Sequence, residues 1–403
     1  MRLPHSILAK LRASLQSAAG HLTPTTRGLI VFLAFWACFV HLLPSFTSTF
    51  VHARRPAPEH WSPAMQAAET PLSRWDARWY FTIATEGYST AGPGQESTVR
   101  FYPLYPLLMA ATSRVTGANP LWAGTIVSVL ALLGTVLLLA RRAKDEDGDA
   151  RAYAVVQALL FFPSAFILTT VYADSLALFG MLLSVELARR ERWWGAGIAG
   201  AAVSLTRVNG CLVLLPLLVL AARSWHSEQR WRPLPALLLT VAGASVFPVY
   251  LWARFDDLLL YFHTRSPGWP QHPRFFATYL WDVGKAVGTA ISTGRVPRSV
   301  QTMSLPAFPI NVGVMLILFW ALAESLRKRK WEDAALMAGA SLFAASVGNL
   351  DSLARHGLIY FPVFSRMGET FEAHPTVRSI AMPVLLGAQT VLVMLFSHWW
   401  FLL

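Results

Sequence analysis

A single acidic residue, Asp76, lies among aromatic and arginine residues in residues 73–88, SRWDARWYFTIATEGY. This segment follows an apolar stretch, residues 28–47, that is long enough to cross a membrane. A carboxylate within hydrogen-bond reach of a hydroxyl group, and ionised at neutral pH, can take the hydroxyl proton. The sequence therefore predicts a general base just outside a membrane span.

Residues 73–88 have the periodicity of a helix. Three apolar residues recur at intervals of four and share one face: Trp75, Trp79 and Ile83. Asp76 and Tyr80 share the adjacent face, Ser73 is the predicted N-cap and Gly87 the predicted end. The pattern predicts an amphipathic helix lying in the membrane interface. A simpler interpretation stays open, in which the helix dipole alone favours Asp76 near the N-terminus.

Composition indicates a membrane protein. Of the 403 residues, 54% are hydrophobic and only 14% are charged, whereas soluble domains have about 25% charged residues. The 16 Trp and 24 Phe are enough for interfacial aromatic belts. The net charge of +12 does not indicate nucleic-acid binding, because the basic residues fall in short clusters between apolar runs. Membrane lipids are therefore expected partners, and nucleic acid is not.

Apolar runs of roughly 20 residues predict spanning helices. Eleven transmembrane or re-entrant segments are expected in an all-α polytopic protein, at residues 28–47, 120–140, 152–170, 172–188, 195–205, 208–222, 234–253, 310–326, 333–350, 357–367 and 380–401. Residues 195–205 and 357–367 are short for a full crossing. The pattern shows no soluble domain, so residues 1–403 are predicted to form one integral-membrane domain.

Basic clusters test this order of spans. Alternation from a cytoplasmic N-terminus places every cluster inside: residues 1–27, 141–144, 189–192, 223–232 and 327–330. Two long outer loops remain, residues 48–119, which carry Asp76, and residues 254–309. The acidic run Asp145-Glu146-Asp147 then falls in a cytoplasmic loop, where we predict a solvated charge run rather than a metal site.

The sequence WDARWYFTIATEGY followed by FYPLYP resembles the signature of the second mannosyltransferase of GPI-anchor synthesis, the PIG-V family, and of its bacterial homologues. Three further stretches are similar to that family and follow in its order: residues 161–175 (FFPSAFILTTVYADS), 204–210 (SLTRVNG) and 351–362 (DSLARHGLIYFP). The resemblance implies a GT-C glycosyltransferase fold and a lipid-phosphate sugar donor. The family's acidic base in the first outer loop corresponds to Asp76.

The resemblance also implies the reaction. A hexose, with mannose expected, would pass from a polyprenyl-phosphate donor to a hydroxyl of a lipid-linked or extracytoplasmic acceptor. A single inverting displacement needs one base and neither a second carboxylate, a metal nor another cofactor. The expected location is a bacterial cytoplasmic membrane with the active site on the outer face, or the ER membrane in a eukaryote. Alternatives are a GT-C transferase for another sugar or a protein acceptor, and a lipid or sugar-lipid transporter.

Basic residues at predicted outer turns are candidates for binding the donor phosphate or sugar. The first is Arg207, followed by Arg355 and His356; Arg78 and Arg100 flank the loop of the base. Arg207 can instead snorkel at the membrane boundary, and the last two can contact solvent or headgroups.

Further substrate-site candidates are mostly aromatic. Asp174 can orient a sugar hydroxyl, pair with Arg207, or be a solvated turn residue. The others are Trp75, Trp79, Tyr80, Tyr102, Tyr172 and Asn209.

Overall fold

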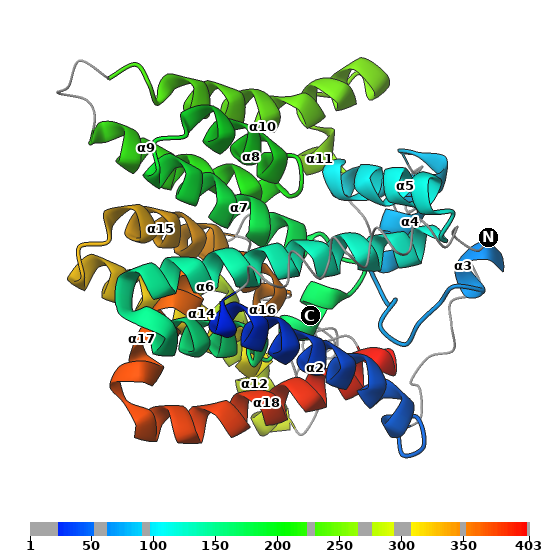
Figure 1. The fold of residues 1–403 in the computed structure, drawn as a ribbon. Helices are drawn as coiled ribbons and strands as arrows, with labels where there is room; N and C mark the ends of the chain where they lie inside the picture. The colour runs from blue at the N-terminus through cyan, green and yellow to red at the C-terminus, as the bar shows by residue number, and fades with distance from the viewer. Residues whose placement is uncertain are drawn as a thin grey trace, which may run out of the picture.

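The computed structural model describes residues 23–51, 63–90, 97–223, 230–264, 276–293, 308–346 and 352–400. Within these ranges the chain is helical with connecting turns, and no strand occurs (Figure 1). The elements are α2 (Pro24–Thr47), α3 (Pro63–Gln66), α4 (Ala77–Glu86), η1 (Thr98–Arg100), α5 (Leu104–Thr116), α6 (Pro120–Leu160), η2 (Ala165–Thr169), α7 (Asp174–Arg189), α8 (Trp193–Ser204), η3 (Val208–Val213), α9 (Leu214–Ala222), α10 (Leu234–Phe255), α11 (Leu260–His263), α12 (Phe276–Thr293), α14 (Phe308–Arg327), α15 (Trp331–Ser346), α16 (Leu353–His356), η4 (Gly357–Ile359), α17 (Pro362–Ala373) and α18 (Pro375–Ser397).

Five described helices are long and apolar enough to cross a membrane. They are α2, α6, α10, the Ile310–Arg327 part of α14, and α18. Large apolar side chains project from them, such as Phe35, which is 74% exposed. Such a surface suits lipid rather than water. The all-α integral-membrane prediction is confirmed, whereas the number of crossings is not.

Two predicted spans are not continuous helices, and proline accounts for both. Residues 152–170 were predicted as one helix, but α6 ends at Leu160 and Pro163 lies in the turns before η2. Residues 357–367 instead comprise η4 and the start of α17, where Pro362 occupies the first turn. Both segments are buried, so apolar composition alone did not distinguish them from spanning helices.

The region between the predicted spans 120–140 and 152–170 agrees with the expectation, since α6 breaks into two there, at Asp147 and Gly148, where the glycine adopts a φ of 80°. The second outer loop contains a helix, α12, where no regular structure was predicted. Its segment at residues 265–275 lies outside the described residues.

The short helix α8 packs tightly against α10 through glycine. A Cβ atom on Gly243 of α10 would lie 2.4 Å from the Cα of Ala201 on α8, so no larger residue fits without displacing a backbone. In the same way, a Cβ on Gly210 would lie 2.1 Å from the Val203 carbonyl oxygen. These contacts hold the turn between α8 and η3, which carries Arg207.

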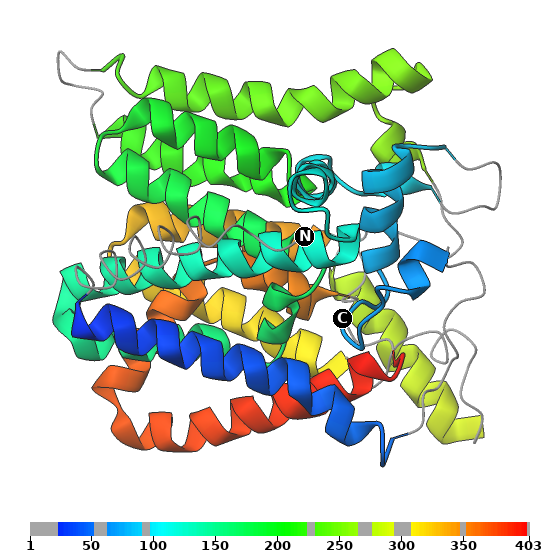
Figure 2. The same cartoon turned by 45° about the vertical axis from the view of Figure 1, so that its right-hand side comes forward.

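The helix α7 connects two polar ends of the bundle. It begins at Asp174 and ends at Arg189, and its 16 residues span about 24 Å at 1.5 Å per residue. Figure 1 shows α3, α4 and α5 at one end of the long helices, and in Figure 2 the blue helices α3 and α4 lie at that end again. The Asp174 end therefore belongs with the candidate base, and the Arg189 end is distant from it.

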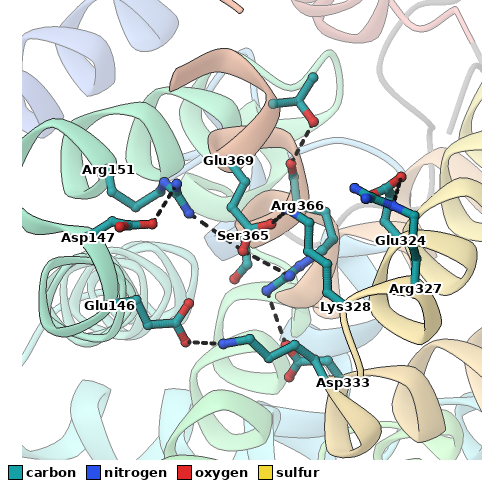
Figure 3. Close-up of polar contacts among 12 residues, drawn as sticks. Glu146, Asp147, Arg151, Glu324, Arg327, Lys328, Asp333, Ser365, Arg366 and Glu369 are labelled. Atoms are coloured by element: carbon teal, nitrogen blue, oxygen red, sulfur yellow. Dashed lines mark hydrogen bonds and ion pairs between the residues drawn. The ribbon is translucent and has the colours of Figure 1, made fainter. Parts of the chain in front are cut away.

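The Arg189 end holds a partly buried network of ion pairs, part of which is drawn in Figure 3. Members of four predicted cytoplasmic clusters join it: Arg142, Arg189, Arg223, Lys328 and Lys330. Those clusters thus lie at one end of the bundle, as predicted. The prediction of a solvated acidic run is wrong for Glu146, which is only 23% exposed and ion-pairs with Lys330 at 3.1 Å.

Candidate active site

Asp76 is presented by a tight turn before α4. The helix begins at Ala77, so Ser73 is not its N-cap as predicted; the Ser73 hydroxyl instead lies 2.8 Å from that of Thr70. Trp75 adopts a φ of 55°, which costs energy for a bulky side chain. Asp76 occupies the N-cap position but makes no capping hydrogen bond with its side chain. The carboxylate is therefore not used to cap α4.

The partner of the Asp76 carboxylate is Arg355 on α16, whose Nη1 ion-pairs with Asp76 Oδ2. The two side chains are 15% and 11% exposed. The Arg355 guanidinium also stacks over the ring of Tyr172, 5.1 Å from its centroid. Burial by itself would lower the pKa of Arg355, but Asp76 and Asp174 together raise that pKa above its usual value. Arg355 therefore remains a cation beside the candidate base.

Tyr172 fixes the turn that carries Asp76. Its hydroxyl donates to the Arg74 carbonyl oxygen at 3.0 Å and accepts from the Asp76 backbone N–H at 3.2 Å. Burial raises the pKa of Tyr172 well above its usual value, so the hydroxyl keeps its proton. Tyr172 thus joins the two residues on either side of Trp75.

Tyr172→Phe is expected to lower the free energy of unfolding by about 1–3 kcal/mol, because it removes both hydrogen bonds and keeps the ring under Arg355. Thermal unfolding in detergent measures the change. Tyr153→Phe is the matched control, since the Tyr153 hydroxyl makes a single 3.5 Å bond to the Thr25 carbonyl. Equal transitions for the two variants would contradict the role given to Tyr172.

A second ion pair joins Asp174 and Arg207. Arg207 Nη1 donates to Asp174 Oδ1 at 2.7 Å. Asp174 is fully buried at the start of α7, and the Arg207 side chain is 12% exposed just before η3. The predicted pairing is confirmed. The alternatives of a solvated Asp174 and a snorkelling Arg207 are wrong.

Both ion pairs act electrostatically on the buried Tyr80. Burial raises its pKa, and Asp76 and Asp174 raise that pKa further, while Arg207 and Arg355 oppose them. All four charged side chains are therefore within electrostatic range of one phenol. The structure thus gathers at one point residues from α4, α7, α16 and the turn before η3.

His356 is a neutral member of the cluster. Burial lowers its pKa well below the usual value, and the positive charges of Arg207 and Arg355 lower it further. Its Nε2 lies 3.5 Å from Arg355 Nη2. His356 can thus hydrogen-bond a substrate but supplies no positive charge to a phosphate at neutral pH.

The remaining predicted residues lie around this cluster. Arg100 donates to the Thr264 carbonyl oxygen at 2.6 Å and lies over the ring of Tyr261, 5.5 Å from its centroid. Tyr102 packs against the same ring at 5.6 Å. Burial raises the pKa of Tyr261, while Arg100 and Arg207 lower it, so the charge of Arg207 also acts on this aromatic group.

The aromatic face of α4 packs against its neighbours. Arg78 lies over the ring of Trp79, 4.4 Å from its centroid, and Trp79 stacks on Phe101 at 6.1 Å. Trp75 meets the edge of Trp399 at 5.5 Å. Because α4 begins at Ala77, Trp75 does not share a helical face with Trp79 and Ile83 as predicted, although both tryptophans have packing partners within the protein.

Sequence reasoning missed two residues of the site, Arg74 and Tyr360. Arg74 ion-pairs with Glu69, and its Nε donates to the Ser397 carbonyl oxygen at 3.2 Å. The hydroxyl of Tyr360 accepts a 3.0 Å hydrogen bond from Asn209. Arg74 directly precedes the stretch WDARWYFTIATEGY, and Tyr360 lies within the stretch at residues 351–362. Their closeness to these stretches could have identified them from the sequence.

No protein-family model matches this chain. Among curated proteins, the chain is similar to GPI alpha-1,6-mannosyltransferase 2 of Mus musculus, with 29% identity over 211 residues. The match covers 49% of this chain and 42% of the mouse protein, so it spans less than half the length of that relative. The resemblance to the GPI mannosyltransferase family is confirmed.

Two solved structures also align with the chain. The structure of ArnT from Cupriavidus metallidurans bound to undecaprenyl phosphate aligns with a TM-score of 0.49 and 16% identity, over 88% of this chain and 62% of that one. The Archaeoglobus fulgidus oligosaccharyltransferase in complex with zinc and sulfate aligns with a TM-score of 0.46 and 13% identity, over 92% and 52%.

Proposed function

We propose that this chain is a GT-C membrane glycosyltransferase. It transfers a hexose, with mannose expected, from a polyprenyl-phosphate donor to a hydroxyl of a lipid-linked or extracytoplasmic acceptor. The observation that carries the proposal is the partly buried ion pair between Asp76 and Arg355, beside a second pair of the same kind. The similarity to the mouse mannosyltransferase supports the choice of sugar.

The reaction follows from these groups. Asp76 takes the proton of the acceptor hydroxyl, whose oxygen attacks the anomeric carbon of the donor. The bond from that carbon to the phosphate oxygen breaks, and the electron pair leaves with polyprenyl phosphate. Because the leaving group is already an anion, it needs cationic stabilisation more than an acid. One carboxylate therefore suffices, and the anomeric configuration inverts.

Arg355 couples the two halves of this reaction. In the structure Arg355 neutralises Asp76. While they are paired, Arg355 is not available to a phosphate and Asp76 is not available to an acceptor hydroxyl. A donor phosphate that takes the guanidinium would release the carboxylate to act as base. Arg207 lies beside this position and provides a second cation, while its partner Asp174 stays buried.

A transfer assay tests the proposal. Purified protein in nanodiscs would receive polyprenyl-phosphate mannose labelled in the sugar, with a lipid extract as acceptor. We expect label in a new lipid together with an equal amount of free polyprenyl phosphate, and no transfer from GDP-mannose. Transfer only from another hexosyl lipid would change the proposed sugar. Transfer only to a protein would change the proposed acceptor. Movement of the intact donor between leaflets without bond cleavage would instead indicate a transporter.

A further inference from the structure

Two buried acceptor atoms near Arg207 have no donor within the described residues. Asp174 Oδ1 is bound by Arg207, but Asp174 Oδ2 has no partner there. Asn209 Nδ2 donates to the Tyr360 hydroxyl at 3.0 Å, and Asn209 Oδ1 likewise lacks a donor. The two residues are 0% and 2% exposed. A buried polar atom without a partner destabilises the protein, so each of these atoms is a place where a ligand could donate a hydrogen bond.

Both atoms are held in fixed orientations. Arg207 binds one oxygen of the Asp174 carboxylate. Arg207 also precedes η3, which carries Asn209 two residues later. The amide of Asn209 is held by Tyr360, which is 1% exposed. Gly210 keeps this turn against α8, where a Cβ would collide with the Val203 carbonyl. Neither side chain can therefore rotate easily to bring its unpaired oxygen to a donor within the protein.

The unused groups of the site are of two kinds. Arg355 Nε, a donor, is buried without a hydrogen-bond partner in the described part of the chain, whereas Asp174 Oδ2 and Asn209 Oδ1 are acceptors. Phosphate oxygens accept hydrogen bonds, and sugar hydroxyls can donate them. The arrangement therefore separates a position for an anion, at Arg355, from a position for hydroxyl groups.

We propose that Asp174 Oδ2 and Asn209 Oδ1 form a subsite that accepts hydrogen bonds from two hydroxyl groups of the donor hexose. This inference rests on the proposed function and adds to it the means by which the sugar is held. The subsite favours a hydroxylated sugar over the bare lipid phosphate, which offers no hydroxyl here. It also favours a hexose over its deoxy analogues, since a missing hydroxyl leaves one acceptor unpaired.

Binding measurements in nanodiscs test the subsite without any turnover. Polyprenyl-phosphate mannose and bare polyprenyl phosphate would be titrated into wild-type protein, Asn209→Ala and Tyr360→Phe. We expect Asn209→Ala to bind the mannosyl lipid about 10-fold more weakly while its Kd for the bare lipid stays within twofold. Tyr360→Phe removes the Asn209 partner but keeps Oδ1, so its loss should be smaller.

Deoxy donors provide the second measurement. At least one mannosyl lipid that lacks a single hydroxyl should bind wild type about 10-fold more weakly than the parent lipid, and Asn209→Ala should show no such difference for that analogue. Equal weakening of mannosyl and bare lipid by Asn209→Ala would overturn the subsite and leave the proposed function standing. Failure of wild-type protein to bind either lipid would overturn both.

Discussion

Asp76→Asn is expected to lower the rate of sugar transfer by about 10²- to 10⁴-fold, the usual contribution of a general base. The amide has the size of the carboxylate and can still accept a hydrogen bond from Arg355, but it cannot take the acceptor proton. The loss should therefore appear in kcat, while the KM for the donor should stay the same or fall, because Asp76 no longer competes with the donor phosphate for Arg355. Initial rates in nanodiscs at saturating donor measure it.

Glu86→Gln is the matched control, since this exposed carboxylate stands at the other end of the same helix, α4. We expect its rate to stay within twofold of wild type. Thermal unfolding of both variants checks that the fold is kept. An Asp76→Asn protein that is folded and turns over at the wild-type rate would show that Asp76 is not the base.

Asp76 could be chosen from sequence as the candidate base because its setting is local. Asp76 stands within a few residues of the tryptophans and arginines that mark the interface. Its counter-ion could not be chosen in the same way. Arg355 lies 279 residues further along the chain, and Arg78 and Arg100 are much closer in sequence to the base. Only the packing of α16 against the turn before α4 selects Arg355.

The fold could be predicted where apolar runs are long, as for α2 and α10, because only a helix satisfies such a backbone in lipid. The prediction failed for residues 152–170 and 357–367. There the apolar side chains fill the protein interior; Pro163 follows the end of α6, and Pro362 lies in the first turn of α17. Hydrophobicity reports burial but does not tell whether lipid or protein surrounds a segment. The unpaired acceptor atoms of Asp174 and Asn209 could not be predicted from sequence either, because they depend on partners from distant helices.

Asp333→Ala is expected to lower the free energy of unfolding by about 3–5 kcal/mol, although it lies far from the site. Asp333 is 0% exposed, and both its oxygens accept from Arg142 Nη2, at 2.8 and 2.9 Å. Its Oδ2 also lies 3.6 Å from Arg366 Nη2 (Figure 3). The substitution leaves two buried cations short of a counter-charge. Unfolding in detergent, followed by helix content, measures the loss.

Glu324→Ala is the control for charge removal itself, because Glu324 pairs with Arg327, whose side chain is 67% exposed. That change should cost no more than about 1 kcal/mol. The double variant Arg142→Met/Asp333→Leu separates pairing from burial, since it removes one cation together with the anion. It should recover part of the stability that Asp333→Ala loses, because the penalty arises from an unpaired buried charge rather than from the absence of attraction. If Asp333→Ala were as mild as Glu324→Ala, the network would not hold α6, α15 and α17 together at this end of the bundle.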